Sequence, residues 1–456
     1  MNSYDVKIWD PKKIGDTAKG RWRVRWAAGG REHCKSFPAR PLADGFAAEL
    51  KNAVRDRHPF DAATGLPATP GQAPPRTWYD HARAYAEMKW PDLAPKSRRS
   101  AAEALTTVTE ALTTTRPGAP EPEILRRALF AWAFNPGTRN LTPPAGITAA
   151  LDWIASASRP VSALEDPAVL RAVLGACART QAGKPAAATT QRRKRAVFYN
   201  AVRYAVELRL LDANPVDRIQ WKAPEVAATV DRRVVVSPAQ AAALLAAVRA
   251  QGTRGEHLEA FYGCLYYAAM RPSETVALRE NDCRLPSRGW GRIDLAVSEP
   301  RAGRDWTDDG TPRQARGLKH RASNETRSVP IPPALVTLLR AHLRKHGAAP
   351  GGRLFRTARG GPLQDSACSA VWQDARTAAL TPAQQASPLA RRPYDLRHAA
   401  VSLWLNSGVP ATEVARRAGH SIAVLLKVYA HCIDGQADTA NKRIADALGD
   451  PTDSGT

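Results

Sequence analysis

The sequence predicts a multidomain protein that is mainly helical and contains small β-sheets. Its 456 residues are enough for roughly two to four domains. Helical spacing of apolar residues runs through most of the chain, whereas strand-like alternation is confined to the N-terminus and to residues 292–331. Hydrophobic residues at 44% and charged residues at 24% are typical of globular proteins, which argues against a largely disordered chain.

Residues 1–66 are predicted to form a three-stranded β-sheet with one helix. Arg21, Arg23 and Arg25 alternate with apolar residues, which is the period of a strand with one solvent-facing side. A Gly-Gly turn leads into a further strand, and residues 41–57 form the helix. The three guanidinium groups would stand about 6.6 Å apart, a spacing that suits DNA phosphates. The alternative is a solvated face without a ligand.

A Pro-, Gly- and Ala-rich stretch at residues 67–76 is predicted to be a linker, and residues 77–222 to be an all-helical domain. Apolar residues from Phe198 to Ala205 recur at the spacing of a buried helix face. Basic residues near the starts of two helices would let this domain grip a DNA backbone, although such runs are often simply solvated. They are Lys96, Arg98 and Arg99 in one helix and Arg192, Arg193, Lys194 and Arg195 in the other.

Residues 234–449 are predicted to form a mixed α+β domain, and the tail at 450–456 to be disordered. A Gly- and Asp-rich loop follows the first strand of this domain, and Ser323-Asn324 form the turn between the second strand and the third. The three strand signals lie at residues 292–297, 315–320 and 326–331.

The chain is strongly basic, with 66 Lys+Arg against 43 Asp+Glu and a formal charge of +23. This surplus favours a polyanionic partner, and nucleic acid fits better than a lipid surface because no amphipathic anchor stands out. The sequence shows no membrane-length apolar run and no signal peptide, so we expect a bacterial cytoplasmic, nucleoid-associated protein. Its six cysteines form no CxxC pair, which argues against a zinc module or a disulfide framework.

Polar residues with catalytic potential cluster near the C-terminus. Arg397 opens an apolar helix, His420 follows a glycine that would end the next helix, and Tyr429 lies on a third. Earlier in the chain, Arg271 follows a buried apolar stretch and Lys319 lies on a predicted strand.

Each of these residues also has an ordinary structural explanation. Tyr429 could be a core aromatic, and His420 a capping histidine. Arg397 could pair with Asp395 or Glu413, and Lys319 could be a surface lysine on an edge strand.

Taken together and in order, these residues resemble those of the tyrosine recombinases, the family of phage and mobile-element integrases. The resemblance extends over essentially the whole chain and implies an arm-type DNA-binding domain, a helical core-binding domain that clamps DNA, and a catalytic domain. It rests on Ala269-Met270-Arg271-Pro272-Ser273-Glu274, Leu318-Lys319-His320-Arg321 with Arg327-Ser328-Val329-Pro330-Ile331-Pro332, Tyr394-Asp395-Leu396-Arg397-His398, Gly419-His420 and Tyr429-Ala430-His431.

The resemblance implies roles for five side chains in attack on a phosphodiester. Arg271 and Arg397 would bind the non-bridging oxygens, and His420 would donate a further hydrogen bond. Lys319 would protonate the departing 5′ oxygen, and Tyr429 would form a 3′-phosphotyrosine. This chemistry needs no nucleotide cofactor or metal.

Tyr394 departs from the family pattern, which has histidine at this position. A phenol can donate a hydrogen bond to a phosphate but is a poor proton acceptor at pH 7. The sequence therefore does not identify the group that takes the proton from Tyr429. Glu274 is interpreted as a support for Arg271 and not as a catalytic group.

The preferred function is a site-specific integrase that acts as a homotetramer on attachment-site DNA through a Holliday junction. An excisionase and a DNA-bending host factor are further candidate partners. The helix predicted at 437–448 would dock either on a neighbouring protomer or on its own domain. The alternatives are a type IB topoisomerase, which uses the same tyrosine chemistry, and a catalytically silent DNA-binding protein in which Tyr394 marks a decayed site.

Overall fold

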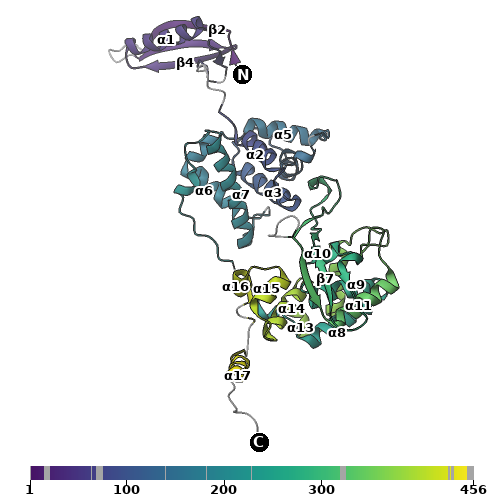
Figure 1. Ribbon diagram of the computed structural model, residues 1–456. Helices are drawn as coiled ribbons and strands as arrows, with labels where there is room; N and C mark the ends of the chain where they lie inside the picture. Colours follow the sequence, from purple (N-terminus) through teal and green to yellow (C-terminus); the bar gives the residue numbers. More distant parts are fainter. Residues whose placement is uncertain are drawn as a thin grey trace.

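The computed structural model describes residues 2–14, 21–62, 64–67, 75–138, 140–180, 182–226, 229–318, 325–429, 432 and 436–448. Lys319, most of the predicted linker and the tail at 450–456 lie outside these residues. Figure 1 shows a sheet-containing unit, a helical unit and a mixed unit that follow one another along the chain. The predicted mainly helical architecture with small antiparallel sheets is confirmed.

The N-terminal unit is a three-stranded antiparallel sheet covered by one helix, as predicted. β3 (Arg21–Ala28) lies between β2 (Val6–Ile14) and β4 (Arg31–Phe37), and α1 (Arg40–Arg55) packs on the sheet. The alternation of β3 decides which face is covered, because Val24, Trp26 and Ala28 are buried in the cluster that α1 completes with Ala43, Ala47 and Leu50. The short strands β1 (Asn2–Ser3) and β5 (Phe60–Asp61) pair with each other.

The helical unit is built around α7 (Ala188–Glu207). Its predicted apolar face is buried, from Phe198 to Ala205, in one cluster with residues of the surrounding helices. Thr77 caps α2 by accepting the Asp80 N–H, and proline occupies the first turn of α3, α4 and α6, where no donor is lost. The other helices are α2 (Trp78–Lys89), α3 (Pro95–Ala111), α4 (Pro122–Ala128), α5 (Ala145–Ala157) and α6 (Pro167–Cys177).

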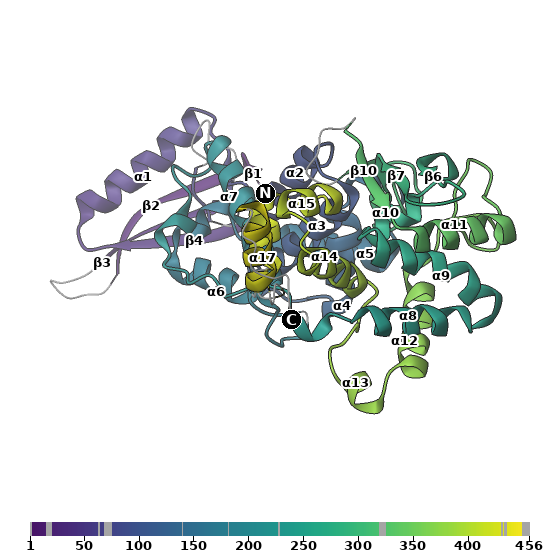
Figure 2. The same cartoon turned by 60° about the horizontal axis from the view of Figure 1, so that its bottom comes forward.

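The C-terminal unit surrounds a small sheet with helices. In this sheet β7 (Gly291–Leu295) lies between β6 (Cys283–Arg284) and β10 (Arg327–Ile331), and Figure 2 shows α11 beside it. The helices are α8 (Pro238–Arg249), α9 (Gly252–Tyr267), α10 (Pro272–Ala277), α11 (Pro333–His346), α12 (Asp365–Ala379), α13 (Pro382–Ala386), α14 (Asp395–Asn406), α15 (Ala411–Ala418), α16 (Ile422–Tyr429) and α17 (Gln436–Leu448).

The strand pairing differs from the predicted hairpin. β9 (Arg316–Gly317) pairs with β8 (Val297–Ser298), whereas β10 pairs with β7. The reason is packing, because the register places Val329 of β10 opposite Ile293 of β7, and both side chains are fully buried. The loop between β8 and β9 therefore extends from the sheet and reaches the helical unit, whose core cluster includes Trp306.

No helix among the described residues is long and apolar enough to cross a membrane. At the C-terminus, α17 contacts the end of α14 through Arg443, whose Nη1 donates to the Gly408 carbonyl at 3.3 Å. Ile444 and Leu448 of α17 are exposed.

Candidate active site

Arg271 is positioned by the start of a helix. It is the residue before α10, and its backbone N–H donates to Glu274 Oε2 at 2.8 Å while its Nη1 donates to Oε1, also at 2.8 Å. Its Nη2 donates to the Gly419 carbonyl at 2.9 Å. Arg271 therefore joins α10 to the end of α15, and its side chain keeps 17% of its surface exposed.

Glu274 is a fully buried carboxylate between two arginines. Besides the bonds from Arg271, it accepts two hydrogen bonds from Arg327 of β10, at 3.1 and 2.7 Å, and both of these side chains are 1% exposed. Burial opposes ionisation of Glu274, but Arg327, Arg271 and Arg397 outweigh it and lower its pKa to about 2. Glu274 is therefore ionised at neutral pH and holds both arginines in place.

Arg397 lies in the first turn of α14 and is fully buried. It pairs with neither carboxylate that the sequence offered, because Asp395 pairs with Arg392, and Glu413 with Arg416 and Arg417. Its Nη1 donates to the Ala269 carbonyl, and its Nη2 donates to the Ala418 carbonyl at 2.5 Å. Burial, assisted by Arg271, lowers the pKa of Arg397 to about 10, which leaves it charged at pH 7.

His420 follows a left-handed glycine that ends α15. Gly419 has φ 65° and ψ 49°, and a Cβ there would lie 2.3 Å from Arg327 Nη1. His420 Nε2 is 2.8 Å from Arg397 Nη2, so it must accept from this arginine. Burial and then Arg397 lower the pKa of His420 to about 3. The ring is thus neutral with its proton on Nδ1, a buried atom without a partner among the described residues.

Tyr429 ends α16 and faces two histidines. Its hydroxyl lies 2.9 Å from His398 Nδ1, and its ring stacks on His420 with centroids 6.0 Å apart and an interplanar angle of 30°. Tyr429 is 1% exposed, and burial raises the pKa of its phenol above the usual value. Burial, Arg397 and Arg392 lower the pKa of His398 to about 4. At neutral pH the phenol is therefore protonated and donates to a neutral His398.

The structure thus brings together five predicted site residues that come from distant segments. They are Arg271, Glu274, Arg397, His420 and Tyr429. Tyr394 lies on the other side of His398, with ring centroids 5.1 Å apart at 69°. Lys319 falls outside the described residues.

Residues 235–435 match the phage integrase family. This match covers most of the C-terminal unit, which we therefore call the integrase-family domain. At the level of whole-chain sequence, no curated protein matches this chain.

Three of the solved structures that are similar to this chain are the following. The Tn1549 transposon integrase, in complex with a circular intermediate DNA, is 14% identical, with a TM-score of 0.46 over 72% of this chain and 100% of that one. The XerH site-specific recombinase bound to difH substrate is 11% identical, with a TM-score of 0.48 over 82% and 98% of the two chains. Lambda integrase bound to DNA is 13% identical, with a TM-score of 0.37 over 62% and 87%.

Outside the integrase-family domain, β3 presents a basic face. Arg21, Arg23 and Arg25 are all exposed, opposite the face that packs on α1. Lys12 of β2 lies directly beside Arg23 in the register and is also exposed. Arg25 additionally forms an ion pair with Glu32 at 2.8 Å and lies over the Trp9 ring.

The basic residues of the helical unit are less available than the sequence suggested. Lys96 and Arg99 are exposed at the start of α3, but Arg98 is 6% exposed and paired with Asp308. Lys194 is 2% exposed, and its ammonium donates to the Arg179 carbonyl at 3.1 Å. The expectation of DNA contacts is therefore wrong for Arg98 and Lys194, because both are buried with protein partners.

The other three residues of the second basic run lie in the second turn of α7, not in its first. Arg193 donates to Glu103 at 2.9 Å, and Arg195 lies 4.5 Å from the centroid of the Trp221 ring. Arg192 is exposed. Of this run, Arg192 is the residue best placed to meet a phosphate.

One cluster in the integrase-family domain has ligand atoms that metals favour. Nitrogen atoms of His257, His342 and His346 lie within 4.8 Å of one another. However, His257 Nε2 accepts the backbone N–H of Arg356 at 3.1 Å, so its proton lies on Nδ1 and neither nitrogen of its neutral ring is free for a metal. Burial and neighbouring positive groups, including Arg356, lower the pKa of His257 to about 4. The donor set therefore fits a neutral histidine network better than a metal centre.

Two functional candidates were missed by the sequence reasoning. His398 was given no role of its own in the site. It directly follows Arg397 and lies one helical turn after Tyr394, which places it beside the same site. Among the described residues of the sheet, Arg327 is the one that forms an ion pair with Glu274. The signal in the sequence was its place at the same alternation as the apolar Val329 and Ile331, which puts all three on one face of a strand.

We predict that Glu274→Gln destabilises the integrase-family domain. The pKa of Glu274 falls from 4.5 to about 2 on folding, which corresponds to about 3 kcal/mol of stability at neutral pH. Because the folded pKa is depressed, this stability is present above about pH 4.5 and is lost as the pH falls toward 2. Urea unfolding at several pH values should show the loss at pH 7 and a flatter pH dependence in the variant. The exposed Glu280→Gln is the control, and equal stability of the two variants would contradict the assignment.

Proposed function

We propose that the protein is a site-specific DNA recombinase, the integrase of a phage or another integrative element, which cleaves and rejoins attachment-site DNA. The observation that carries this proposal is the convergence of Arg271, Arg397, His420 and Tyr429 from four separate segments. Two guanidinium groups, a neutral imidazole donor and a phenol are the groups that a metal-independent attack on a phosphodiester needs.

The phosphate would bind between the two arginines. Arg271 Nη2 and both Nη atoms of Arg397 now donate to backbone carbonyls, which are weaker partners than a phosphate anion. The proton on His420 Nδ1 lacks a partner among the described residues and is available to a phosphate oxygen. Tyr429 is buried at 1% exposure, so α16 would have to shift for its hydroxyl to reach phosphorus.

The chemical step is a transfer of the phosphodiester to tyrosine. A bond forms between Tyr429 Oη and phosphorus, while the bond from phosphorus to the 5′ oxygen breaks. The phenolic proton passes to His398 Nδ1, its present acceptor at 2.9 Å, and Lys319 supplies a proton to the 5′ oxygen. Phosphate bound to Arg397 would offset the positive charge that lowers the pKa of His398 and so make it a better base.

The remaining parts of the chain would serve binding and assembly. We infer that residues 1–66 bind arm-type sites through the basic face of β3, that residues 77–222 grip the core site, and that residues 234–449 perform the reaction. Exposed Ile444 and Leu448 suit α17 for docking on a neighbouring protomer within a homotetramer. Tyr394 would donate a hydrogen bond to the phosphate or steady the His398 ring.

We predict that Tyr429→Phe abolishes covalent complex formation while DNA binding is kept. A nicked duplex that traps the cleaved strand should yield a denaturant-resistant adduct with the wild type and none with the variant, as seen by denaturing gel electrophoresis. The exposed Tyr4→Phe is the matched control and should form the adduct normally. An adduct of undiminished yield with Tyr429→Phe would overturn the assignment of the nucleophile.

We predict that His398→Gln slows cleavage by about 10²–10⁴-fold, the range of a lost general base. Glutamine can still accept a hydrogen bond from Tyr429 but cannot take its proton, so cleavage by the variant should rise with pH as hydroxide replaces the base. Single-turnover cleavage between pH 6 and 9 measures this. The control is His346→Gln, a half-buried histidine on α11 whose ring contacts are to His257 and His342. Wild-type rates in His398→Gln would show that this histidine takes no proton.

We predict that replacing Arg21, Arg23 and Arg25 by alanine lowers the salt dependence of DNA binding. Each lost phosphate contact should reduce the magnitude of the slope of log K against log salt by about 0.9. The slope of the triple variant should therefore be smaller in magnitude by about three. Titrations of the full chain with labelled duplex DNA at about 50 to 300 mM salt give this slope. Lys51→Ala, on the exposed side of α1, should leave it unchanged. An unaltered slope in the triple variant would mean that this face meets no DNA.

A further inference from the structure

The loop between β8 and β9, residues 299–315, docks on the helical unit, and we name it the clasp loop. Its Trp306 is 5% exposed and belongs to the core cluster of the helical unit. The indole lies 5.0 Å from the ring centroid of Phe130 and 6.1 Å from that of Trp90. A tryptophan from one unit therefore completes the hydrophobic core of another.

An ion pair between the buried Arg98 and the half-exposed Asp308 lies beside this tryptophan. Arg98 donates from Nη1 and Nη2 to the two carboxylate oxygens of Asp308, at 2.6 and 3.2 Å, and from Nη1 to the Trp306 carbonyl at 3.1 Å. Its Nε donates to the Trp90 carbonyl at 2.9 Å, and its guanidinium lies 4.4 Å from the centroid of the Trp90 ring. The Arg98 guanidinium thus binds the clasp loop and is not available to DNA.

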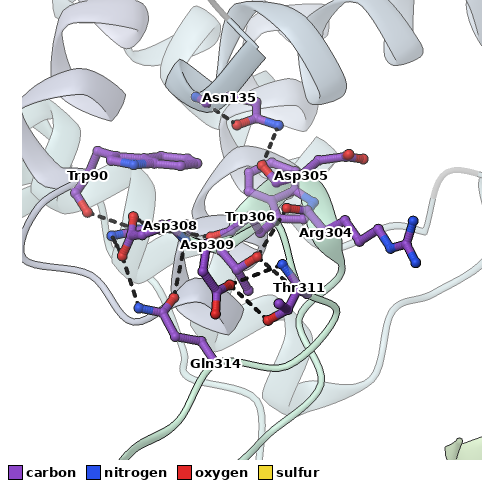
Figure 3. A network of polar contacts seen from close by, with 12 residues as sticks. Trp90, Asn135, Arg304, Asp305, Trp306, Asp308, Asp309, Thr311 and Gln314 are labelled. Carbon is purple, nitrogen blue, oxygen red and sulfur yellow. Dashed lines mark hydrogen bonds and ion pairs between the residues drawn. The ribbon is translucent and has the colours of Figure 1, made fainter. Parts of the chain in front are cut away.

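A second polar contact fixes the other side of the clasp loop. Asn135, 1% exposed, donates from Nδ2 to the Asp305 carbonyl at 3.0 Å and accepts the Gly137 N–H on Oδ1 at 3.1 Å (Figure 3). A Cβ at Gly137 would lie 3.2 Å from the Asp305 carbonyl oxygen. The surface of the helical unit is therefore shaped to receive this backbone.

The clasp loop also carries its own internal bonds. Gln314 donates to Asp308 Oδ2 at 3.1 Å, and Thr311 donates to Asp309 Oδ1 at 2.8 Å, as Figure 3 shows. At the base, Arg353 forms two bonds of 2.9 Å with Glu299. These contacts hold the loop in its docked shape, so little conformational entropy is lost when it docks.

The clasp loop is the second link between the helical unit and the integrase-family domain. The first link is covalent, the connector at residues 219–233. The second link consists of the contacts that Trp306, Asp308 and the Asp305 carbonyl of the clasp loop make with the helical unit. The two units and the two links therefore form a ring of protein.

We propose that this ring holds duplex DNA topologically, with the clasp loop as its gate. This inference rests on the proposed function, in which the helical unit grips the same DNA that the integrase-family domain cleaves. Since the connector is covalent, a duplex without free ends can pass into the ring only when Trp306 and Asp308 leave the helical unit. Once the clasp loop has docked again, a circular DNA is retained even when its ionic contacts with the protein are broken.

The test compares circular and linear DNA under conditions that screen charge. Tyr429→Phe protein, which forms no covalent link, is loaded at low salt on a closed circular plasmid or on the same plasmid cut once, and the complexes are then washed in about 1 M salt. We expect the complexes on circles to survive at least about ten times longer than those on linear DNA. Cutting the circle after the wash should release the protein.

Two gate variants and two matched controls make the test specific. Trp306→Ala should shorten the lifetime on circles by about 100-fold or more, the equivalent of a lost core tryptophan. Asp308→Asn, at a half-exposed site that should not affect folding, should shorten it by about tenfold. Trp290→Ala, at 61% exposure, and Asp309→Asn, which contacts only its own loop, should retain circles as the parent does.

The outcomes separate the two proposals. Binding to both DNA forms with equal salt-induced release overturns the ring while leaving the recombinase proposal intact. Retention on circles that Trp306→Ala and Asp308→Asn do not shorten overturns the clasp loop as the gate. Failure to bind either DNA at low salt overturns both proposals.

Discussion

The pairing of one buried carboxylate with two arginines is the interaction on which the site depends. Glu274 accepts four hydrogen bonds, from the backbone and side chain of Arg271 and from Arg327, and so connects α10 to β10. Among the described residues no carboxylate forms an ion pair with Arg397, which donates instead to two backbone carbonyls and to His420. Glu274 thus pairs with two of the three guanidinium groups, and the site keeps a net positive charge that is suited to a phosphodiester.

This excess of positive charge determines the protonation of the neighbouring groups. It adds to burial in keeping His398 and His420 neutral, with pKa values of about 4 and 3. A neutral His420 can accept from Arg397 and still carry a proton on Nδ1, and a neutral His398 can accept from Tyr429. The same charges oppose the effect of burial on the Tyr429 phenol, because Arg397 and Arg271 favour its ionised form. A bound phosphate would change all of these balances together.

The sequence was most informative where a short-range pattern decides the structure. The alternation in β3 predicted which arginines are exposed, and the spacing around Phe198 predicted the buried face of α7. It was least informative where a partner lies far along the chain. Arg98 looked like a surface residue because its carboxylate partner is 210 positions away, on a loop whose docking no local pattern reveals. The partnership of His398 with Tyr429, 31 positions apart, likewise depends on how α14 and α16 pack.

The clasp loop also connects the two units to the reaction. It ends at β9, which pairs with β8 through only Arg316 and Gly317, and Lys319 follows two residues later in the sequence. Docking of Trp306 and Asp308 restrains the loop that leads into β9. The same strand would therefore take part both in closing the ring and in positioning the proposed acid. With the clasp loop undocked, this strand would keep its pairing with β8 and the bonds that Arg313 forms with Glu299, Leu363 and Asp365, but it would lose the restraint from the helical unit. Docking of Trp306 and Asp308 would therefore favour cleavage of DNA that the ring already encloses.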